Sequence, residues 1–282
     1  VLNGISCEDP REYQAYTLRP VLNDLDQIAI WRRYSDNTRL PPAAIHIDTG
    51  MNRLGLSQTL LAQSGKLENL YENLDVSLIM SHLACADEWH HEKNLDQLRR
   101  FQSLISTSKI IPASLSASSG IFLGPNWHFD LVRPGFAIYG GNPQPATPNP
   151  LDPVVRLSAK ILQCRTVAKG DTVGYGASHK FSADKRIATI AVGYADGFFR
   201  SLSSRGTVFI GKTPLTILGR VSMDLIAIDI TGVDGVKASD WVDIVGPYQD
   251  VDALAATAGT IGYEVLTALG QRHQREYVGA IA

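Results

Sequence analysis

The first 141 residues alternate short apolar runs with segments of helical spacing, and this alternation limits the fold more than any other feature of the chain. Apolar strands that alternate with amphipathic helices are typical of a buried parallel sheet. The helical segments are marked by leucines between 60 and 74 and by apolar residues between 95 and 105. The runs that we interpret as strands span residues 1–4, 18–23, 43–48, 76–82, 110–117 and 131–140.

The number of these runs indicates an incomplete barrel. A closed barrel of parallel strands and helices has eight units, whereas this half of the chain supplies six. An open arc would leave two sheet edges in water, which is costly. The sequence also begins with Val1, inside the first apolar run. We therefore expect a TIM-like (β/α)8 barrel that lacks an N-terminal part of roughly two units.

The second half follows a different pattern. Five prolines within residues 142–153 exclude a helix or a central strand, so we expect a linker there. It would join a partial barrel in residues 1–141 to a C-terminal β domain in residues 154–282. In that domain we expect one helical segment, residues 251–269. The expected strands are 154–165, 186–192, 207–210, 215–218, 225–230 and 242–245.

Composition excludes several classes of protein. The net charge of −2 gives no basic surface for nucleic acid, and no apolar run is long enough to span a membrane. The N-terminus lacks the features of a signal peptide. Cys7, Cys85 and Cys164 lie far apart, without the spacing of a zinc site. We expect a cytoplasmic protein with reduced thiols and no bound metal.

Polar residues cluster at the carboxyl ends of the expected parallel strands, where a parallel barrel places its active site. They are Asp48, Arg53, His82, Ser119 and Arg133. Singly, each is explained as a helix cap, a surface charge or a core histidine. Together they favour a site for an anionic, ring-bearing ligand. The N–H groups of Gly135 and Phe136 are expected to face a phosphate beside the Ser119 hydroxyl.

Seven segments, taken in order and spacing, resemble bacterial alanine racemase. They are DTGMNRLG, SHLACAD, SASSG, RPGFAIYGG, VGYGAS, VGYADGFFR and GRVSMD, and they extend over nearly the whole chain. Without the resemblance, the tyrosines of the last segments would be read as packing or surface residues. The resemblance implies a pyridoxal 5'-phosphate enzyme with an N-terminal (β/α)8 barrel and a C-terminal β domain. It also implies a head-to-tail homodimer that acts on alanine, with each active site completed by the partner's β domain.

Carried over to the first half, the resemblance assigns Arg53 to the phenolic oxygen of the cofactor and to the substrate carboxylate. Arg133 would face the pyridine nitrogen, and His82 would support Arg133. The implied phosphate cradle consists of Ser119, Gly135 and Phe136. An arginine at the pyridine nitrogen would leave that nitrogen unprotonated, which should disfavour side reactions such as transamination.

In the second half, the resemblance makes Tyr175 a catalytic base donated across the dimer. Removing and returning a proton on opposite faces of a carbon needs two bases. A tyrosine, with an ordinary pKa of about 10, needs a neighbouring cation to act as one. Tyr194 would line the access route and help to hold the phosphate, and Met223 and Asp224 would face the substrate. The implied corridor charges are Asp87, Arg200 and Arg220.

The sequence departs from the family at three positions. The lysine that bonds the cofactor covalently and serves as the other base is not found at a strand end, so we expect the chain as given to be inactive. His46 replaces the carbamylated lysine that steadies the arginine in many members, so Arg53 would need another partner. Gln271 replaces a gate tyrosine. A non-catalytic relative used for binding or dimerisation, and a racemase of broader specificity, remain as alternatives.

Overall fold

The computed structural model describes residues 1–5, 10–35, 40–63, 67–106 and 111–279, and it divides into two compact units. The first unit comprises Val1–Ile138 and Asn142–Pro150, and the second comprises Tyr139–Gly141 and Leu151–Ala282. In the described ranges, no helix is long and apolar enough to cross a membrane. Nor do these ranges contain three or more histidine, cysteine or acidic side chains grouped to hold a metal ion.

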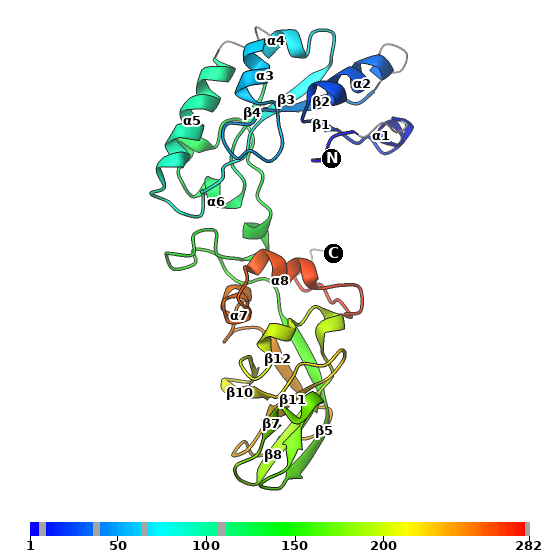
Figure 1. Ribbon diagram of the computed structural model, residues 1–282, viewed down its shortest axis with the longest axis vertical. Helices are drawn as coiled ribbons and strands as arrows, with labels where there is room; N and C mark the ends of the chain where they lie inside the picture. Colours follow the sequence, from blue (N-terminus) through cyan, green and yellow to red (C-terminus); the bar gives the residue numbers. More distant parts are fainter. Residues whose placement is uncertain (6–9, 36–39, 64–66, 107–110, 280–282) are drawn as a thin grey trace. The chain divides into compact units, whose positions relative to one another are not determined.

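A four-stranded parallel sheet forms the centre of the first unit (Figure 1). Its order is β1 (Val21–Leu22), β2 (Ala43–His46), β3 (Val76–Met80) and β4 (Ala113–Ser114). One row of paired residues crosses the whole sheet and packs into the main core: Leu22, Ile45, Ile79 and Ala113. The parallel order brings the carboxyl ends of all four strands to one edge.

Helices pack against this sheet and complete its core. The two longest are α2 (Leu25–Ser35) and α5 (Glu92–Ile105), which bury Trp31 and Phe101 respectively. The His91 side chain caps α5 by accepting a hydrogen bond from the Lys93 N–H. The shorter helices are α1 (Arg11–Ala15), α3 (Gln58–Gln63), α4 (Leu67–Leu70) and α6 (Ser118–Ile121), with 3-10 turns η1 (Pro125–Trp127) and η2 (Phe136–Tyr139).

Two of the six expected strands of the first half are wrong. Residues 1–4 form a turn, in which Gly4 adopts φ 75° and its N–H donates to the Val1 carbonyl. Residues 131–140 contribute only one parallel bridge, between Arg133 and Ala117, before η2 begins. Pro134 has no N–H, so it cannot extend a ladder beyond that bridge. The start of the expected strand 110–117 lies outside the described residues.

The proline-rich stretch is divided between the two units rather than standing apart from them. Asn142 accepts from the Gln144 N–H and donates to the Thr147 carbonyl, which fixes a compact turn. The Gln144 side chain is 3% exposed, and its amide lies 3.5 Å from the Ala86 carbonyl. Residues 142–150 therefore belong with the first unit, although the prolines prevent regular structure there.

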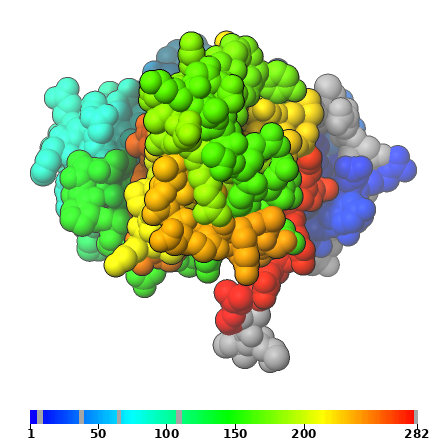
Figure 2. Space-filling model, turned by 90° about the horizontal axis from the view of Figure 1, so that it is seen from below, coloured from blue at the N-terminus to red at the C-terminus, as the bar shows by residue number. Residues whose placement is uncertain are grey.

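A closed six-stranded barrel forms the second unit, in the order β10-β11-β8-β5-β12-β9. In the space-filling view its green, yellow and orange segments form one continuous surface (Figure 2). Because closure pairs every strand on both sides, the barrel leaves no open edge. The strands are β5 (Leu157–Val167), β8 (Lys185–Ile190), β9 (Thr207–Ile210), β10 (Thr213–Leu218), β11 (Ile226–Asp229) and β12 (Trp241–Val245).

The six expected strands of the second half are confirmed, but closure and some local structure were not foreseen. A small hairpin of β6 (Thr172–Val173) and β7 (His179–Lys180) was missed. The expected single helix is two helices, α7 (Val251–Ala258) and α8 (Gly262–Ala268). Gly259 ends α7 in the left-handed conformation, with φ 81°, which breaks the run.

From the sequence we expected no glycine-rich phosphate-binding loop, but residues Gly206 to Thr213 do match its spacing, GxxxxGK[ST]. The four intervening residues are strand β9, and Thr213 begins β10. A phosphate-binding loop needs a helix N-terminus after the lysine, and here an antiparallel hairpin follows instead. The match is therefore a coincidence of residue spacing within a β-hairpin, and these residues do not form a phosphate-binding site.

Candidate functional site

The loop after β2 is shaped by Asp48. Its carboxylate accepts hydrogen bonds from the N–H groups of Gly50, Met51 and Asn52 at 2.8, 2.9 and 3.1 Å. Asp48 therefore holds a turn, and it is not the counter-ion of Arg53. The Arg53 side chain is exposed and makes no hydrogen bond or ion pair with a described residue. The loop thus presents a free guanidinium at the carboxyl end of the sheet.

Arg133 is anchored by the ends of β3 and β4. Its guanidinium donates to the Ser81 carbonyl at 2.7 Å, the Leu115 carbonyl at 3.2 Å and the Ser114 hydroxyl at 2.5 Å. Burial lowers the pKa of Arg133 to about 10, so the group is still charged at neutral pH. No carboxylate among the described residues pairs with it. A half-buried cation without a counter-ion favours an anionic or electron-rich ligand.

Two histidines lie with these arginines and are neutral. Burial, followed by the charges of Arg133 and Arg53, lowers the pKa of His82 to about 4. Burial and the same two arginines lower the pKa of His46 to about 4, although Asp48 opposes this. The His82 Nδ1 lies 3.3 Å from the guanidinium of Arg133 and can accept from it. The charges of both arginines lower the pKa of both histidines, so all four side chains lie near one another at one end of the sheet.

The structure brings Ser118, rather than Ser119, to Gly135. The Ser118 hydroxyl accepts from the Gly135 N–H at 3.0 Å and from the Ala137 N–H at 3.2 Å. The Ser119 side chain makes no hydrogen bond to a described residue, and Phe136 is buried. A Cβ built on Gly135 would meet nothing within 4 Å, so open space faces this glycine. Since the Ser118 hydroxyl accepts twice, its own proton remains available for an anion.

Sequence reasoning missed two side chains that support this site. Ser118 was passed over because three serines lie within residues 116–119 and nothing in their pattern distinguishes them. Asn23, at the end of an apolar run, was not considered at all. Its Oδ1 lies 2.7 Å from the His46 Nδ1, while its amide donates to the Val21 and Leu2 carbonyls. A polar residue directly after a buried strand was the available signal.

The expected residues of the second unit also come together. A hollow of about 230 Å³ is lined by Tyr175, Tyr194, Arg200, Arg220, Val221 and Ser222. The Tyr194 N–H donates to the Ser222 carbonyl at 3.0 Å, which joins two of the segments. A Cβ built on Gly176 would lie 2.9 Å from the Arg220 guanidinium, so that cation sits against the loop of Tyr175. The hollow therefore combines two phenols with two cations.

The remaining expected residues lie on the surface. Met223 is exposed, and Asp224 forms an ion pair with Arg272 at 2.6 Å. Arg272 also pairs with Asp196, at 3.4 Å, beside the loop of Tyr194. Gln271 is exposed in the same segment, and Asp87 is exposed in the first unit. The Arg272 bridge was not expected from the sequence.

The features of the two units indicate a class of protein. A parallel sheet carries basic and imidazole side chains at its carboxyl edge, and a closed β barrel carries a tyrosine–arginine hollow. This is the class of two-domain enzymes that join a parallel barrel-like domain to a β domain. Sequence models of the N-terminal and C-terminal domains of alanine racemase match residues 1–143 and 154–277. The chain belongs to the alanine racemase family.

Individual relatives agree with this assignment. The chain is 44% identical over 275 residues to an alanine racemase of Acidiphilium cryptum, covering 98% of this chain and 77% of that protein. It is also 44% identical over 281 residues to a catabolic alanine racemase of Agrobacterium fabrum, covering 99% and 72%. None of the comparisons confirms the expectation that an N-terminal segment is missing, and that expectation stays a prediction.

Solved structures support the fold. The alanine racemase of Bartonella henselae with covalently bound pyridoxal phosphate gives a TM-score of 0.91 at 38% identity. It covers 99% of this chain and 78% of its own chain. The biosynthetic enzyme of Pseudomonas aeruginosa gives a TM-score of 0.84 at 32% identity, covering 96% and 76%. Pyridoxal phosphate is thus covalently bound in the Bartonella henselae relative.

The residues of the first unit fit this cofactor. Its pyridine nitrogen is a hydrogen-bond acceptor, and the Nε–H of Arg133 has no acceptor among the described residues. Its phosphate needs donors beside open space, which the Ser118 hydroxyl and the uncovered side of Gly135 provide. Its phenolic oxygen needs a cation, which Arg53 provides. No described carboxylate competes for either arginine.

Proposed function

We propose that this protein is an alanine racemase that interconverts L-alanine and D-alanine with pyridoxal phosphate. The observation that carries the proposal is Arg133, a half-buried guanidinium held by the Ser81 and Leu115 carbonyls with no carboxylate partner among the described residues. A pyridoxal-phosphate enzyme that protonated its ring nitrogen would place an acid there. Arginine instead favours a chemistry that keeps the ring nitrogen neutral.

When bound, the cofactor withdraws electrons from the substrate carbon that loses its proton. Arg133 would donate an N–H to the ring nitrogen and disfavour its protonation, because a second positive charge beside the guanidinium is unfavourable. His82, which is neutral, accepts from Arg133 and keeps the guanidinium oriented. Neither side chain needs to change its protonation state.

Arg53 binds anionic oxygen at the other side of the ring. With the cofactor bound, its free guanidinium would contact the phenolic oxygen of the cofactor and the substrate carboxylate. His46 is a neutral imidazole, so it offers Arg53 an acceptor but no charge. The full charge of Arg53 therefore remains available to the ligand.

The phosphate is held by Gly135 and the serines of α6. The Ser118 hydroxyl accepts from the Gly135 and Ala137 N–H groups, so it would donate its own proton to the phosphate. We propose that Ser119 and the Phe136 N–H belong to the same phosphate cradle. Tyr194 contributes a further hydroxyl from the second unit of a partner copy.

Tyr175 serves as a base on one face of the substrate. Arg220, which lies against the loop of Tyr175, stabilises the phenolate that forms when the hydroxyl gives up its proton. In a homodimer, Tyr175, Met223 and Asp224 of one copy face the cofactor residues of the other. The enzyme would work in the cytoplasm and supply D-alanine for peptidoglycan.

The positions of the described lysines indicate whether one of them can serve as the second catalytic base. Lys93 lies in α5, and the others lie in the second unit, so none follows a strand of the parallel sheet. We expect the 282 residues by themselves to bind pyridoxal phosphate without bonding it, and to show no racemase activity. Borohydride treatment followed by mass spectrometry tests this, since a covalently retained cofactor would contradict it.

Cofactor binding by the full chain tests the proposal. We would titrate pyridoxal phosphate and compare the wild type with Arg133→Met and with the control Arg156→Met. Arg156 is an exposed residue of the second unit that pairs with Asp243. Arg133→Met should weaken binding at least tenfold, because it removes a charge-assisted donor, and Arg156→Met should not. A wild type that binds no pyridoxal phosphate refutes the proposal.

A further inference from the structure

Gln97 is a completely buried amide in the middle of α5. Its side chain is 0% exposed, although α5 packs its other buried face with apolar residues such as Leu98 and Phe101. Burying an amide is favourable only where its groups find partners. The partners of this amide are therefore informative about why it is there.

Each side-chain hydrogen bond of Gln97 goes to a loop that carries a site residue. The Nε2 donates to the Thr49 hydroxyl at 3.1 Å and to the His82 carbonyl at 2.9 Å. The Oε1 accepts from the Ala84 N–H at 2.9 Å. Thr49 lies in the loop of Arg53, and His82 and Ala84 follow β3. One amide thus ties together the loops after two adjacent strands.

The network continues from Gln97 to Arg133. The Thr49 hydroxyl lies 2.8 Å from the Ser81 hydroxyl, and both side chains are buried. The carbonyl of Ser81 and the ring of His82 each contact the guanidinium of Arg133. Gln97 therefore fixes the two neighbouring residues whose groups orient Arg133.

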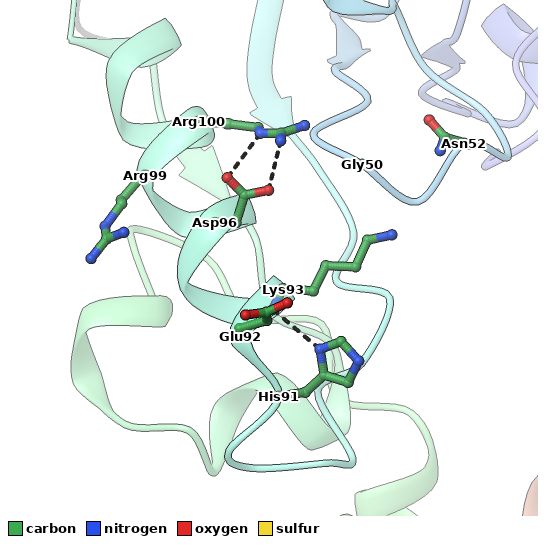
Figure 3. A pocket seen from close by; sticks show the side chains of 8 residues that line it. All are labelled: Gly50, Asn52, His91, Glu92, Lys93, Asp96, Arg99 and Arg100. Atoms are coloured by element: carbon green, nitrogen blue, oxygen red, sulfur yellow. Dashed lines mark hydrogen bonds and ion pairs between the residues drawn. The ribbon is translucent and has the colours of Figure 1, made fainter.

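The same face of α5 supports the loop of Arg53. A Cβ built on Gly50 would lie 3.6 Å from the Gln97 Cγ, 3.7 Å from the Lys93 Cε and 3.8 Å from the Arg100 guanidinium. Figure 3 shows Lys93 and Arg100 extending from α5 toward the loop of Gly50 and Asn52. Gln97 occupies the middle of this face, so its amide is covered by the loop and excluded from water.

We propose that Gln97 is a positioning residue of the cofactor site, which acts through His82 and Thr49 to set the placement of Arg133 and Arg53. This inference rests on the proposed function for the identity of the cofactor. The hydrogen bonds of Gln97 hold the two loops at a fixed separation, so both arginines reach one ring. Without the amide, the His82 carbonyl and the Ala84 N–H lose their buried partner, and the loops shift to regain one.

The test uses two substitutions of Gln97 in the full chain. Gln97→Glu keeps the shape of the side chain and an acceptor for the Ala84 N–H, but it loses the donor to the His82 carbonyl. Gln97→Leu removes all three hydrogen bonds. A matched control is Asn94→Leu, because Asn94 is also a buried amide of α5 and donates to two loop carbonyls, those of Cys85 and Glu88.

Three measurements are made on each variant: the melting temperature, the affinity for pyridoxal phosphate, and the 15N resonances of the His82 ring without cofactor. Gln97→Leu and Asn94→Leu should lose similar melting temperature. Only the Gln97 variants should shift the His82 resonances and weaken cofactor binding, by about tenfold, as when the group that orients a ligand-binding residue is lost.

The outcomes separate this inference from the proposed function. If the wild type fails to bind pyridoxal phosphate, the proposed function is wrong, and the His82 resonances still report on the positioning. If both Gln97 variants melt lower but keep the His82 resonances and the cofactor affinity of the wild type, the role of Gln97 is only structural and the inference is overturned. Equal effects of Asn94→Leu on both readouts would overturn it too.

Discussion

The His46 Nδ1 lies 2.7 Å from the Oδ1 of Asn23, and this pair fixes which nitrogen of His46 carries the proton. The Asn23 amide already donates to the Val21 and Leu2 carbonyls, so its Oδ1 is the atom that faces the imidazole. His46 must then donate from Nδ1, which leaves Nε2 as an acceptor. The result is a neutral, oriented imidazole at the end of β2 (Ala43–His46).

Asn23→Asp should raise the pKa of His46 from about 4 toward or above its ordinary value of 6.5, because a carboxylate stabilises the imidazolium. An NMR titration of the ring measures this directly. The control is His82, which does not contact Asn23 and should move less. A His46 that still titrates near pH 4 in the variant would show that Asn23 does not control it.

The free energy of unfolding should fall as the pH is lowered from 7 to 5. Both His46 and His82 have native pKa values of about 4 and unfolded values near 6.5, so the unfolded chain takes up protons first. Their stabilising contribution is complete above pH 6.5 and is lost between pH 6.5 and 4. The loss between pH 7 and 5 should be roughly 2 kcal/mol for each histidine at most.

Urea unfolding at the two pH values checks this. His82→Asn should reduce the pH dependence, since it removes one of the two groups. A stability that is constant between pH 7 and 5 would contradict the assignment of neutral, half-buried histidines.

Ser118→Ala and Ser119→Ala should have different effects. Ser118 is buried and accepts from two N–H groups, so its loss should cost roughly 1–3 kcal/mol of unfolding free energy and should also weaken binding of pyridoxal phosphate. Ser119→Ala should leave the stability nearly unchanged. If Ser119→Ala alone weakens cofactor binding, then Ser119 holds the phosphate and Ser118 only supports the backbone.

Gly193→Ala should disrupt the hollow of the second unit. A Cβ at this position would lie 2.2 Å from the Met223 carbonyl oxygen, so the segments of Tyr194 and Met223 would have to separate. We expect a loss of roughly 2–4 kcal/mol in stability. Gly270→Ala is the control, because a Cβ there meets nothing within 4 Å. Equal melting temperatures for the two variants would contradict this packing.

The fold was predictable from sequence where one strong local pattern decides it. Strands of the second unit such as β9 (Thr207–Ile210) are bounded by glycine turns, and their positions were correct. The errors fall where one residue overrides an apolar run. Gly4 turns the chain, Pro134 stops a ladder, and Gly259 divides a helix in two. Closure of the barrel depends on long-range pairing, which no local pattern encodes.

The candidate site was predictable in its charged residues and less so in their support. Arg53 and His82 follow β2 and β3 of the parallel sheet, so topology alone brings them together. Arg133 joins them through a single bridge to Ala117, although the strand expected around it does not form. Gln97 was missed because a buried amide inside a helix leaves no mark in the hydrophobic pattern, whereas Asn23 was missed although its place directly after an apolar run was a usable signal. Their partners are backbone carbonyls and neighbouring side chains, which only the folded structure specifies.

The uncompensated charge of Arg133 makes the melting temperature a sensor of what the protein binds. Any small anion or ring acceptor that settles beside the guanidinium removes an electrostatic penalty that only the native state carries. Occupancy therefore stabilises the fold by RT ln(1 + [L]/Kd), about 2.7 kcal/mol at a concentration one hundred times the Kd. Heating the protein with one candidate compound after another would rank those compounds before any catalytic assay exists.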